Sequence, residues 1–353
     1  MFFSKTKRKS ILGIDIGTSF IKAVQLKKEK NGQPYVLESY GIVRVVYPVH
    51  PKEGKIDPIK QTAEVLKELH ARSKFTTKEV SLSLPSNVAF VSVMELPPMP
   101  ESEIQRSVEY KAKKYIPLPL SEVNLSWQIL EEYAKTESPA QKNNSGKINI
   151  LITAVAKSVV ENYVRLAQLA GLDLSVLEIE SLSTMRSLVK PDDSEGKIII
   201  DIGAKSSIIS LLYRGYLRAS RHLSVGGDSI TNSIAKSLGV SFDRAEQMKF
   251  STLANETNPA VAHLAQAVLE IIKSETQQLI RVAENHGQKI EKVILTGGGS
   301  RLLGIENNFI DLVPKVERGN PLAEINYNPL LKNKLNNLAP QLAVAIGLAM
   351  RSG

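Results

Sequence analysis

Two short stretches of the sequence carry the residue types from which a phosphate site is built. Residues 11–26 (ILGIDIGTSFIKAVQL) and 198–212 (IIIDIGAKSSIISLL) each join two apolar runs through Asp-Ile-Gly and a few small or polar residues. Apolar, β-branched runs on both sides of such a turn predict a β-hairpin. Asp15 and Gly17 recur as Asp201 and Gly203, 186 residues later. The sequence therefore predicts the same device used twice.

The chemistry of these turns follows from their residue types. Glycine lets the backbone approach a phosphate closely, and hydroxyl side chains such as Thr18 and Ser19 add donors. A carboxylate beside a phosphate is repelled unless a cation lies between them, so Asp15 and Asp201 predict a metal-bound nucleotide phosphate held between two halves of the chain. The alternative is a strand-end turn with a structural Asp, and the second copy argues against it.

Other candidate residues are individually weaker. The stretch 296–302 (TGGGSRL) follows an apolar strand, so Gly297, Gly298 and Gly299 could lie flat against a base or ribose, or serve close helix–strand packing. Lys22 follows the first turn at a spacing that lets it reach a phosphate. The pair Glu246 and Lys249 shares one helix face and could equally be a surface ion pair. Glu180 ends a strand, where capping and surface carboxylates are common.

Length and composition restrict the class of protein. A chain of 353 residues favours two domains with separate cores. The absence of Cys excludes a disulfide scaffold, Cys-based zinc sites and thiol catalysis. The five His residues have no i,i+4 pair, which argues against a His metal site.

The net charge of +9 does not indicate nucleic-acid binding. Residues 1–30 hold eight basic and two acidic side chains, and the remaining 323 residues contribute only +3. The excess is a basic tail without any nucleic-acid-binding motif, which we expect to be a solvated end or a weak contact for anionic lipid. Because no apolar run reaches the roughly 20 residues of a membrane span, we expect a cytoplasmic protein that touches a membrane at most peripherally.

The order of predicted elements suggests four segments. Residues 1–10 form the tail, 11–85 and 172–195 a discontinuous first lobe, 86–171 an inset of βαββα pattern, and 196–353 a second lobe. The helices are predicted over 59–73, 101–115, 159–170, 181–188, 229–238, 242–250, 259–287 and 340–350, and Asp228 is placed to cap the helix that begins at 229. Residues 190–197 (KPDDSEGK) read as the linker between the lobes.

The order of these motifs resembles a known superfamily. A phosphate hairpin, an inset, a strand-end acid, a second phosphate hairpin, a GGD turn, an ExxK helix and a GGG turn follow one another, as in the split nucleotide-binding proteins related to actin, heat-shock chaperones and sugar kinases. Within it, the inset and the stretches GIDIGTSFIKAV, SVGGDSITNSIAKSLG and VILTGGGSRLLG resemble the PilM family of type IV pilus assembly proteins, which is related to FtsA. The resemblance covers the chain beyond the tail.

This resemblance implies a duplicated α/β, actin-like (ribonuclease H-like) fold with two lobes around a nucleotide cleft. It implies Mg²⁺ and ATP as ligands, with Asp15 and Asp201 at the metal and Glu180 orienting the attacking water in a slow ATPase at most. The remaining implied contacts are the phosphate loops (Gly17, Thr18, Ser19, Lys22; Gly203, Lys205, Ser206) and the adenosine contacts (Glu246, Lys249, Gly297, Gly298, Gly299). The second loop departs from the family, because it reads AKSS where a Thr is more usual.

For function, the resemblance implies a nucleotide-sensitive scaffold at the inner face of the cytoplasmic membrane in a type IV pilus or related secretion platform. The inset would bind the N-terminal cytoplasmic peptide of a PilN-like inner-membrane protein, and other platform proteins are expected partners. The alternatives are a small-molecule kinase of the same superfamily and a polymerising cytoskeletal protein, so the oligomeric state stays open.

Overall fold

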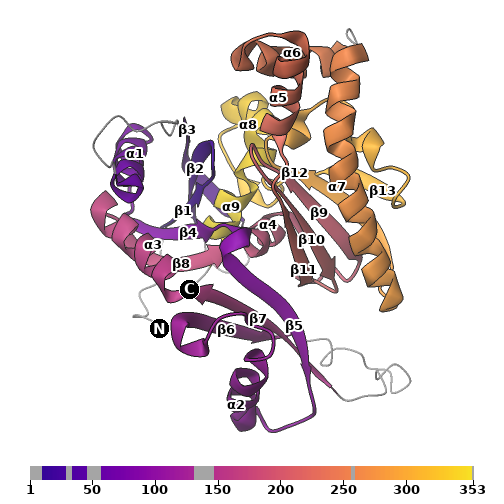
Figure 1. Ribbon diagram of the computed structural model, residues 1–353. Coiled ribbons are helices and arrows are strands. Elements are labelled where there is room, and N and C mark those ends of the chain that lie inside the picture. Colours follow the sequence, from indigo (N-terminus) through magenta and orange to yellow (C-terminus); the bar gives the residue numbers. More distant parts are fainter. Residues whose placement is uncertain (1–9, 29–33, 46–56, 131–146, 256–258, 352–353) are drawn as a thin grey trace.

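The computed structural model describes residues 10–28, 34–45, 57–130, 147–255 and 259–351. The basic tail up to residue 9 and almost all of the polar loop 135–147 lie outside the described residues. Within the described part, two large sheets stand beside each other, and a smaller third sheet extends from them at the bottom of Figure 1.

The first sheet has six strands in the order β14-β3-β2-β1-β4-β8. They are β1 (Ser10–Ile16), β2 (Phe20–Lys27), β3 (Tyr35–Arg44), β4 (Glu79–Leu84), β8 (Asp173–Ile179) and β14 (Ile325–Asn326). The second sheet has five strands in the order β11-β10-β9-β12-β13. They are β9 (Gly196–Ile202), β10 (Ser207–Tyr213), β11 (Tyr216–Leu223), β12 (Ile290–Thr296) and β13 (Lys315–Arg318).

The two sheets share one plan. In each, a first strand pairs antiparallel with the next strand (β1 with β2, β9 with β10) and parallel with a later one (β1 with β4, β9 with β12). A third antiparallel strand and a second parallel strand extend both sheets, and the first sheet has β14 in addition, paired with β3. The predicted hairpins and the predicted duplication are therefore confirmed.

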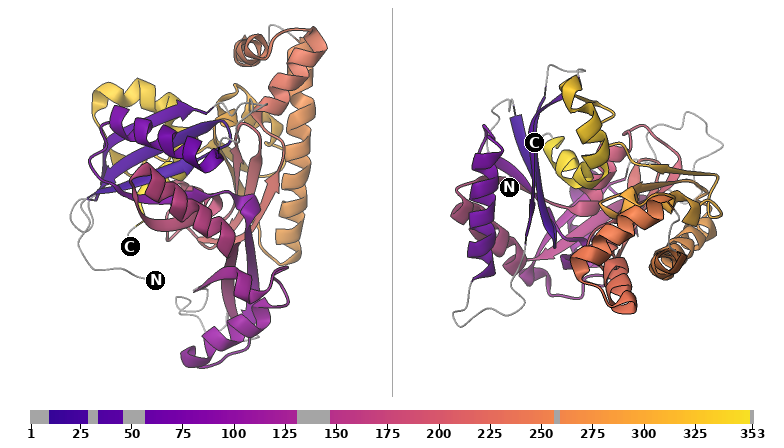
Figure 2. Two further views of the ribbon diagram at one scale, coloured as in Figure 1. Left: turned by 60° about the vertical axis from the view of Figure 1, so that its left-hand side comes forward. Right: turned by 90° about the horizontal axis from the view of Figure 1, so that it is seen from above.

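Side-chain alternation along β1 divides the first lobe into two layers. Leu12 and Ile14 face one side of the sheet, where α1 (Pro58–Arg72) and α3 (Lys157–Ala170) cover them. Gly13 faces the other side, which α8 (Lys332–Leu338) and α9 (Ala343–Ala349) cover. The C-terminal segment, predicted as part of the second lobe, thus packs on the first sheet (Figure 2).

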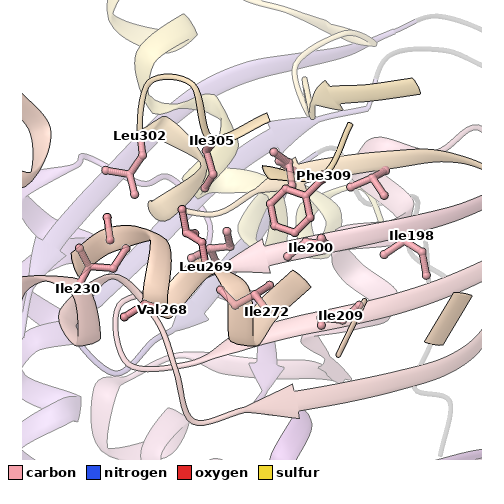
Figure 3. Packing of buried hydrophobic residues seen from close by; sticks show 14 of the residues in the cluster. Ile198, Ile200, Ile209, Ile230, Val268, Leu269, Ile272, Leu302, Ile305 and Phe309 are labelled. Carbon is pink, nitrogen blue, oxygen red and sulfur yellow. The ribbon is translucent and has the colours of Figure 1, made fainter. Parts of the chain in front are cut away.

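The second lobe packs α5 (Gly227–Leu238), α6 (Phe242–Asn255) and α7 (Pro259–Asn285) beside the second sheet. Figure 3 shows its core, in which Ile200 and Ile209 of the sheet meet Leu269 and Ile272 of α7 and Phe309. The prediction that Asp228 caps α5 is wrong: the N-cap is Gly226, and Asp228 lies in the first turn. None of the described helices is both long enough and apolar enough to cross a membrane.

Two helices lie between the large sheets. One side of α4 (Glu180–Leu188) packs on the second sheet through Met185 and Leu188. Its other side crosses α9 so closely that a Cβ on Gly347 would lie 1.8 Å from the carbonyl oxygen of Ser183. A Cβ on Gly13 would lie 2.1 Å from the carbonyl oxygen of Ala345. Glycine at both positions is therefore required for β1, α9 and α4 to pack this closely on one another.

A buried carboxylate fixes the same crossing. Glu178 at the end of β8 accepts two hydrogen bonds from Arg186 of α4, at 2.6 and 2.7 Å, and one from Arg351 after α9, at 2.6 Å. Arg186 also donates to the carbonyl oxygen of Gly347 at 2.9 Å. Burial alone would raise the pKa of Glu178, but the two guanidinium groups outweigh it and lower the pKa. The carboxylate stays ionised and ties β8, α4 and α9 together.

The inset has its own sheet, in the order β5-β7-β6. Its elements are β5 (Ala89–Leu96), α2 (Glu101–Ala112), β6 (Val123–Ile129) and β7 (Ile148–Ala156). Ile104, Val108 and Ala112 of α2 cover one face of this sheet. The helix α3, predicted as part of the inset, buries Leu166 and Ala167 against the first lobe beside α1, while Val159 and Val160 near its start pack with Val155 of the inset. The helix therefore joins the inset to the first lobe.

We predict that Gly347→Ala destabilises the fold strongly. The added methyl group would lie 1.8 Å from the carbonyl oxygen of Ser183, where backbone atoms must move. Overpacking typically costs about 1–3 kcal/mol, and a clash with backbone atoms belongs at the upper end of this range, which chemical denaturation would measure. The matched control is Gly298→Ala, whose Cβ meets no heavy atom within 4 Å. Equal unfolding free energies for the two variants would contradict the role given to this crossing.

Candidate functional site

The first turn, between β1 and β2, contains an ion pair between the buried Asp15 and the half-buried Lys22. Asp15 and Lys22 are paired in the strand register, and Lys22 Nζ lies 2.7 Å from Asp15 Oδ2. Ser83 at the end of β4 donates to Asp15 Oδ1 at 3.1 Å and accepts the backbone N–H of Ile16 at 3.1 Å. Burial opposes charge on Lys22, but Asp15 outweighs it and raises the pKa of Lys22. A fixed ammonium group therefore lies beside the first turn.

The two predicted phosphate turns have the same backbone. Gly17 donates its N–H to the carbonyl oxygen of Phe20 at 3.1 Å, and Gly203 donates to that of Ser206 at 2.9 Å. A Cβ on either glycine would lie 2.8 Å from the same carbonyl oxygen. Both turns therefore require glycine for the same reason, which is that a Cβ would clash with the carbonyl oxygen three residues later. The N-terminal turn of α5 supports the second of them, because Gly227 donates to the carbonyl oxygen of Gly203 at 2.9 Å.

Asp201 ends β9 and lies against the glycine-rich turn. A Cβ on Gly297 would lie 2.2 Å from Asp201 Oδ1, and Gly297 has a φ of 81°, so no other residue fits there easily. Burial and the charge of Asp15 outweigh the attraction of Lys22 and raise the pKa of Asp201 to about 6. The carboxyl group of Asp201 is therefore held in a place that disfavours its charge.

Glu180 is the first residue of α4, where the helix leaves β8. Its Oε2 accepts the backbone N–H of Ser86 at 3.3 Å. Burial is the main cause that raises its pKa to about 8, followed by the charges of Asp15 and Asp201. The Ser86 N–H and Lys22 act in the opposite direction but do not compensate. Without a cation, Glu180 holds its proton at neutral pH.

The predicted charged residues Asp15, Lys22, Asp201 and Glu180 therefore meet in one electrostatic cluster from three separate parts of the chain. Three carboxylates and one ammonium group give a formal charge of −2 when all are ionised. Among the described residues, no three or more His, Cys, Asp or Glu side chains form a metal site by themselves. Mg²⁺ usually takes only one or two carboxylates and completes its shell with phosphates and water, so this cluster fits a metal that arrives with a nucleotide.

The pair Glu246 and Lys249 is not a surface ion pair. Lys249 is only 3% exposed. Its Nζ lies 2.6 Å from Glu246 Oε2, 2.9 Å from Thr231 Oγ1 and 3.2 Å from the carbonyl oxygen of Gly227. These three contacts use all donors of the ammonium group, so Lys249 anchors α6 to the N-terminus of α5. The carboxylate of Glu246 is left at the exposed edge of this cluster.

The glycine-rich turn follows β12. A Cβ on Gly299 would lie 2.3 Å from Ile202, whereas Gly298 is half-buried with open space beside it. The guanidinium of Arg301, in the next turn, lies 5.7 Å from the ring centroid of Phe250, and Lys249 Nζ lies 5.0 Å from the same ring. The sequence reading missed Phe250, although it ends the ExxK helix segment, and it gave Arg301 no role.

Some predicted residues are not brought into close contacts. Thr18 and Lys205 are exposed, and Ser19 and Ser206 are half-buried at the tips of the two turns. Their roles toward phosphate stay predictions. Ser83, Ser86 and Thr231 were not predicted, because single serines and threonines in strands, turns and helices carry no distinctive pattern.

Two like sheets around a central helix pair, with acidic turns meeting between them, define the class of actin-like ATPase folds. A solved structure of MreB 5 of Spiroplasma citri bound to AMPPNP is similar, with a TM-score of 0.52 at 14% identity over 97% of this chain and 95% of that one. A PilM-PilN type IV pilus biogenesis complex is more similar, with a TM-score of 0.78 at 25% identity, covering 97% of this chain and 98% of the other.

The chain belongs to the family of type IV pilus assembly protein PilM, whose sequence profile matches residues 13–353. The cell division protein FtsA of Enterococcus faecalis is 22% identical over 352 residues, which cover 88% of this chain and 77% of that protein. The predicted family and the predicted actin-like fold are both confirmed.

We predict that Glu180→Gln makes the protein without nucleotide or metal less sensitive to pH. Between the unfolded value near 4.5 and the folded pKa of about 8, only the folded state keeps the proton on Glu180. Rising pH therefore favours the unfolded state across this range, and above about pH 7, where Asp201 with its pKa of about 6 is almost fully ionised, Glu180 dominates the fall within the cluster.

The measurement is the unfolding free energy in chelator from pH 6 to 8, compared with an exposed matched control, Glu161→Gln. The parent protein and the control should lose stability with rising pH more steeply than Glu180→Gln. Parallel pH profiles for all three proteins would contradict the burial and charge argument.

Proposed function

We propose that the chain binds Mg-ATP between its two glycine turns and acts as a nucleotide-sensitive scaffold of a type IV pilus or related secretion platform. The observation that carries the nucleotide part is the meeting of Asp201 and Glu180, two half-buried carboxyl groups with raised pKa values, near Lys22. A divalent cation with its phosphates would relieve this repulsion. Membership of the PilM family supports the scaffold part.

Asp15 and Asp201 are the groups that would hold Mg²⁺, directly or through its water shell. When bound, the ion would neutralise phosphate charge and let the carboxylates and phosphates coexist. Asp201 fits this role better than Asp15, since Lys22 and Ser83 already bind both oxygens of Asp15. Asp15 would then act mainly by holding Lys22 toward the phosphates.

The other residues divide the nucleotide between them. Backbone N–H groups of the two turns, with Thr18, Ser19, Lys205 and Ser206, would hold the phosphates. Glu246 and the face of residues 297–299 would contact the adenosine, and Lys249 would position Glu246. Glu180 would orient the attacking water, and we expect hydrolysis to be slow at most.

We predict that Mg-ATP raises the melting temperature of the parent protein by several degrees and that Asp201→Asn loses most of this shift. A ligand that binds only the folded state stabilises it by about 2.7 kcal/mol at a hundred times its Kd. Asp201→Asn keeps the size of the side chain and removes the charge that attracts the metal. Asp173→Asn, an exposed change at the start of β8, is the matched control. If Asp201→Asn responds to Mg-ATP as the control does, the metal assignment is wrong.

We further propose that the partner is the N-terminal cytoplasmic peptide of a PilN-like inner-membrane protein and that this peptide binds at the inset. The solved structure that matches with a TM-score of 0.78 is a PilM-PilN complex, which supports a partner of this kind. In the described inset sheet, β5 and β6 are edge strands, and an edge strand can accept an extended peptide. The chain would thereby stay at the inner face of the cytoplasmic membrane, beside other platform proteins.

The side of β5 away from α2 is the favoured contact for this peptide. Phe90, Met94 and Leu96 point into the core under α2, so alternation places Val91 and Val93 on the opposite face. Both are half-buried, but Val91 packs in the apolar cluster shared with the first lobe and Val93 does not. Val93 therefore offers apolar surface to a ligand without belonging to the core of the inset.

We predict that Val93→Asp weakens binding of a PilN-like N-terminal peptide by about tenfold or more. The charge would have to be buried under the peptide, whereas the unbound protein can leave it in water. Titration of the peptide against the full chain measures the effect. The matched control is Val282→Asp on α7, which places the same charge on an exposed valine of the second lobe. Equal affinities for both variants would place the partner elsewhere.

A further inference from the structure

The connection from the first lobe into the inset contacts Glu180 directly. Ser86 follows β4 and Pro85, opens a short 3₁₀ helix, and is separated by only two residues from the first strand of the inset. Its backbone N–H donates to Glu180 Oε2 at 3.3 Å. The chain therefore leaves the first lobe for the inset at a residue whose backbone N–H hydrogen-bonds Glu180 of the charge cluster.

The surroundings of this contact join three parts of the molecule. A small apolar cluster combines Leu84 of β4, Ile179 beside Glu180, Val155 of the inset and Leu217 of β11 in the second lobe. The hydroxyl oxygen of Ser86 is buried, and no described group accepts from it or donates to it. The backbone N–H is thus the polar contact that holds the entry to the inset against Glu180.

We infer that the Ser86 N–H is a positioning contact for Glu180 and couples occupancy of the cleft to the placement of the inset against β11. This coupling rests on the proposed binding of Mg-ATP. A cation and phosphates beside Glu180 alter the electrostatic forces on its carboxyl group and thereby its position. Because the Ser86 N–H is hydrogen-bonded to this carboxyl group, the residues that enter the inset shift with it. By reciprocity, a ligand that moves the inset changes nucleotide affinity by the same factor.

Proline at position 86 tests the contact with little other change. Ser86→Pro removes the N–H, while the first position of a helical turn accepts the fixed φ of proline. The preceding Pro85 has φ −56° and ψ 137°, the extended conformation that a residue before proline prefers. The matched control is Ser86→Ala, which keeps the N–H and removes only a hydroxyl without a described partner.

The measurement is hydrogen exchange of the full chain with and without Mg-ATP, read at β5 and β11. In the parent protein and in Ser86→Ala, nucleotide should change exchange at these strands by about fivefold or more, the lower end of usual couplings. In Ser86→Pro, the nucleotide should still raise the melting temperature, but the change at β5 and β11 should be lost. If Ser86→Pro keeps it, or if Ser86→Ala loses it too, the inference is wrong.

A second variant tests the same bond without nucleotide and covers the case in which Ser86→Pro does not fold. Glu180→Ala removes the acceptor, so in the free protein it should increase exchange at β5 and β11 while α8 stays unchanged. Unchanged β5 and β11 would overturn the coupling. A parent protein that binds no nucleotide would overturn the proposed function and the coupling together, whereas binding without any response at β5 would overturn only the coupling.

Discussion

The close crossing of α4 and α9 is the constraint on which the arrangement of the molecule depends. Gly13 and Gly347 remove the side chains that would hold β1, α9 and α4 apart. Glu178 then ties β8, α4 and the residue Arg351 after α9 with charged hydrogen bonds. Because α4 begins with Glu180 and β1 ends beside Asp15, this packing also sets where two of the three carboxyl groups of the cluster lie. Contacts that are purely structural thereby determine the geometry of the site.

Duplication of the sheet produces equal backbones with unequal charges. Asp15 is paired in register with Lys22, whereas Asp201, its counterpart, is paired with Ile208. Asp15 therefore has Lys22 as a directly paired cation, whereas Asp201 interacts with the same lysine only through its charge. The first lobe therefore supplies a fixed positive charge beside its aspartate, whereas the second lobe has an aspartate without a cation paired to it. Under the proposed function, this asymmetry would favour a single metal–nucleotide complex between the two halves.

The hairpins, the duplication and most helices could be predicted from the sequence, because the spacing of apolar residues and the glycine turns determine the local structure. Residues 198–200 and 208–209 read as strands in any context. The burial of Lys249 could not be predicted, since an i,i+3 pair looks the same on an exposed and a buried helix face. The packing of α3 could not be predicted either, because a βαββα pattern suggests that the helix belongs to the inset, yet Leu166 and Ala167 pack beside α1. Asp228 was the predicted cap because Asp is a strong N-cap residue, but the helical backbone begins at Gly227, which makes Gly226 the N-cap.

The charge cluster also has a cost that bears on function. Asp201 and Glu180 are kept in places that oppose their ionisation, which lowers the stability of the unliganded protein at neutral and alkaline pH. A protein selected only for stability would replace such groups by apolar or neutral ones. Glu180 in addition takes its one backbone hydrogen bond from the connection to the inset rather than from its own lobe. If a cation binds as proposed, it would relieve this repulsion at Glu180, whose hydrogen-bond partner lies where the inset begins. The groups that lower the stability of the unliganded protein would then be the ones that respond to the nucleotide.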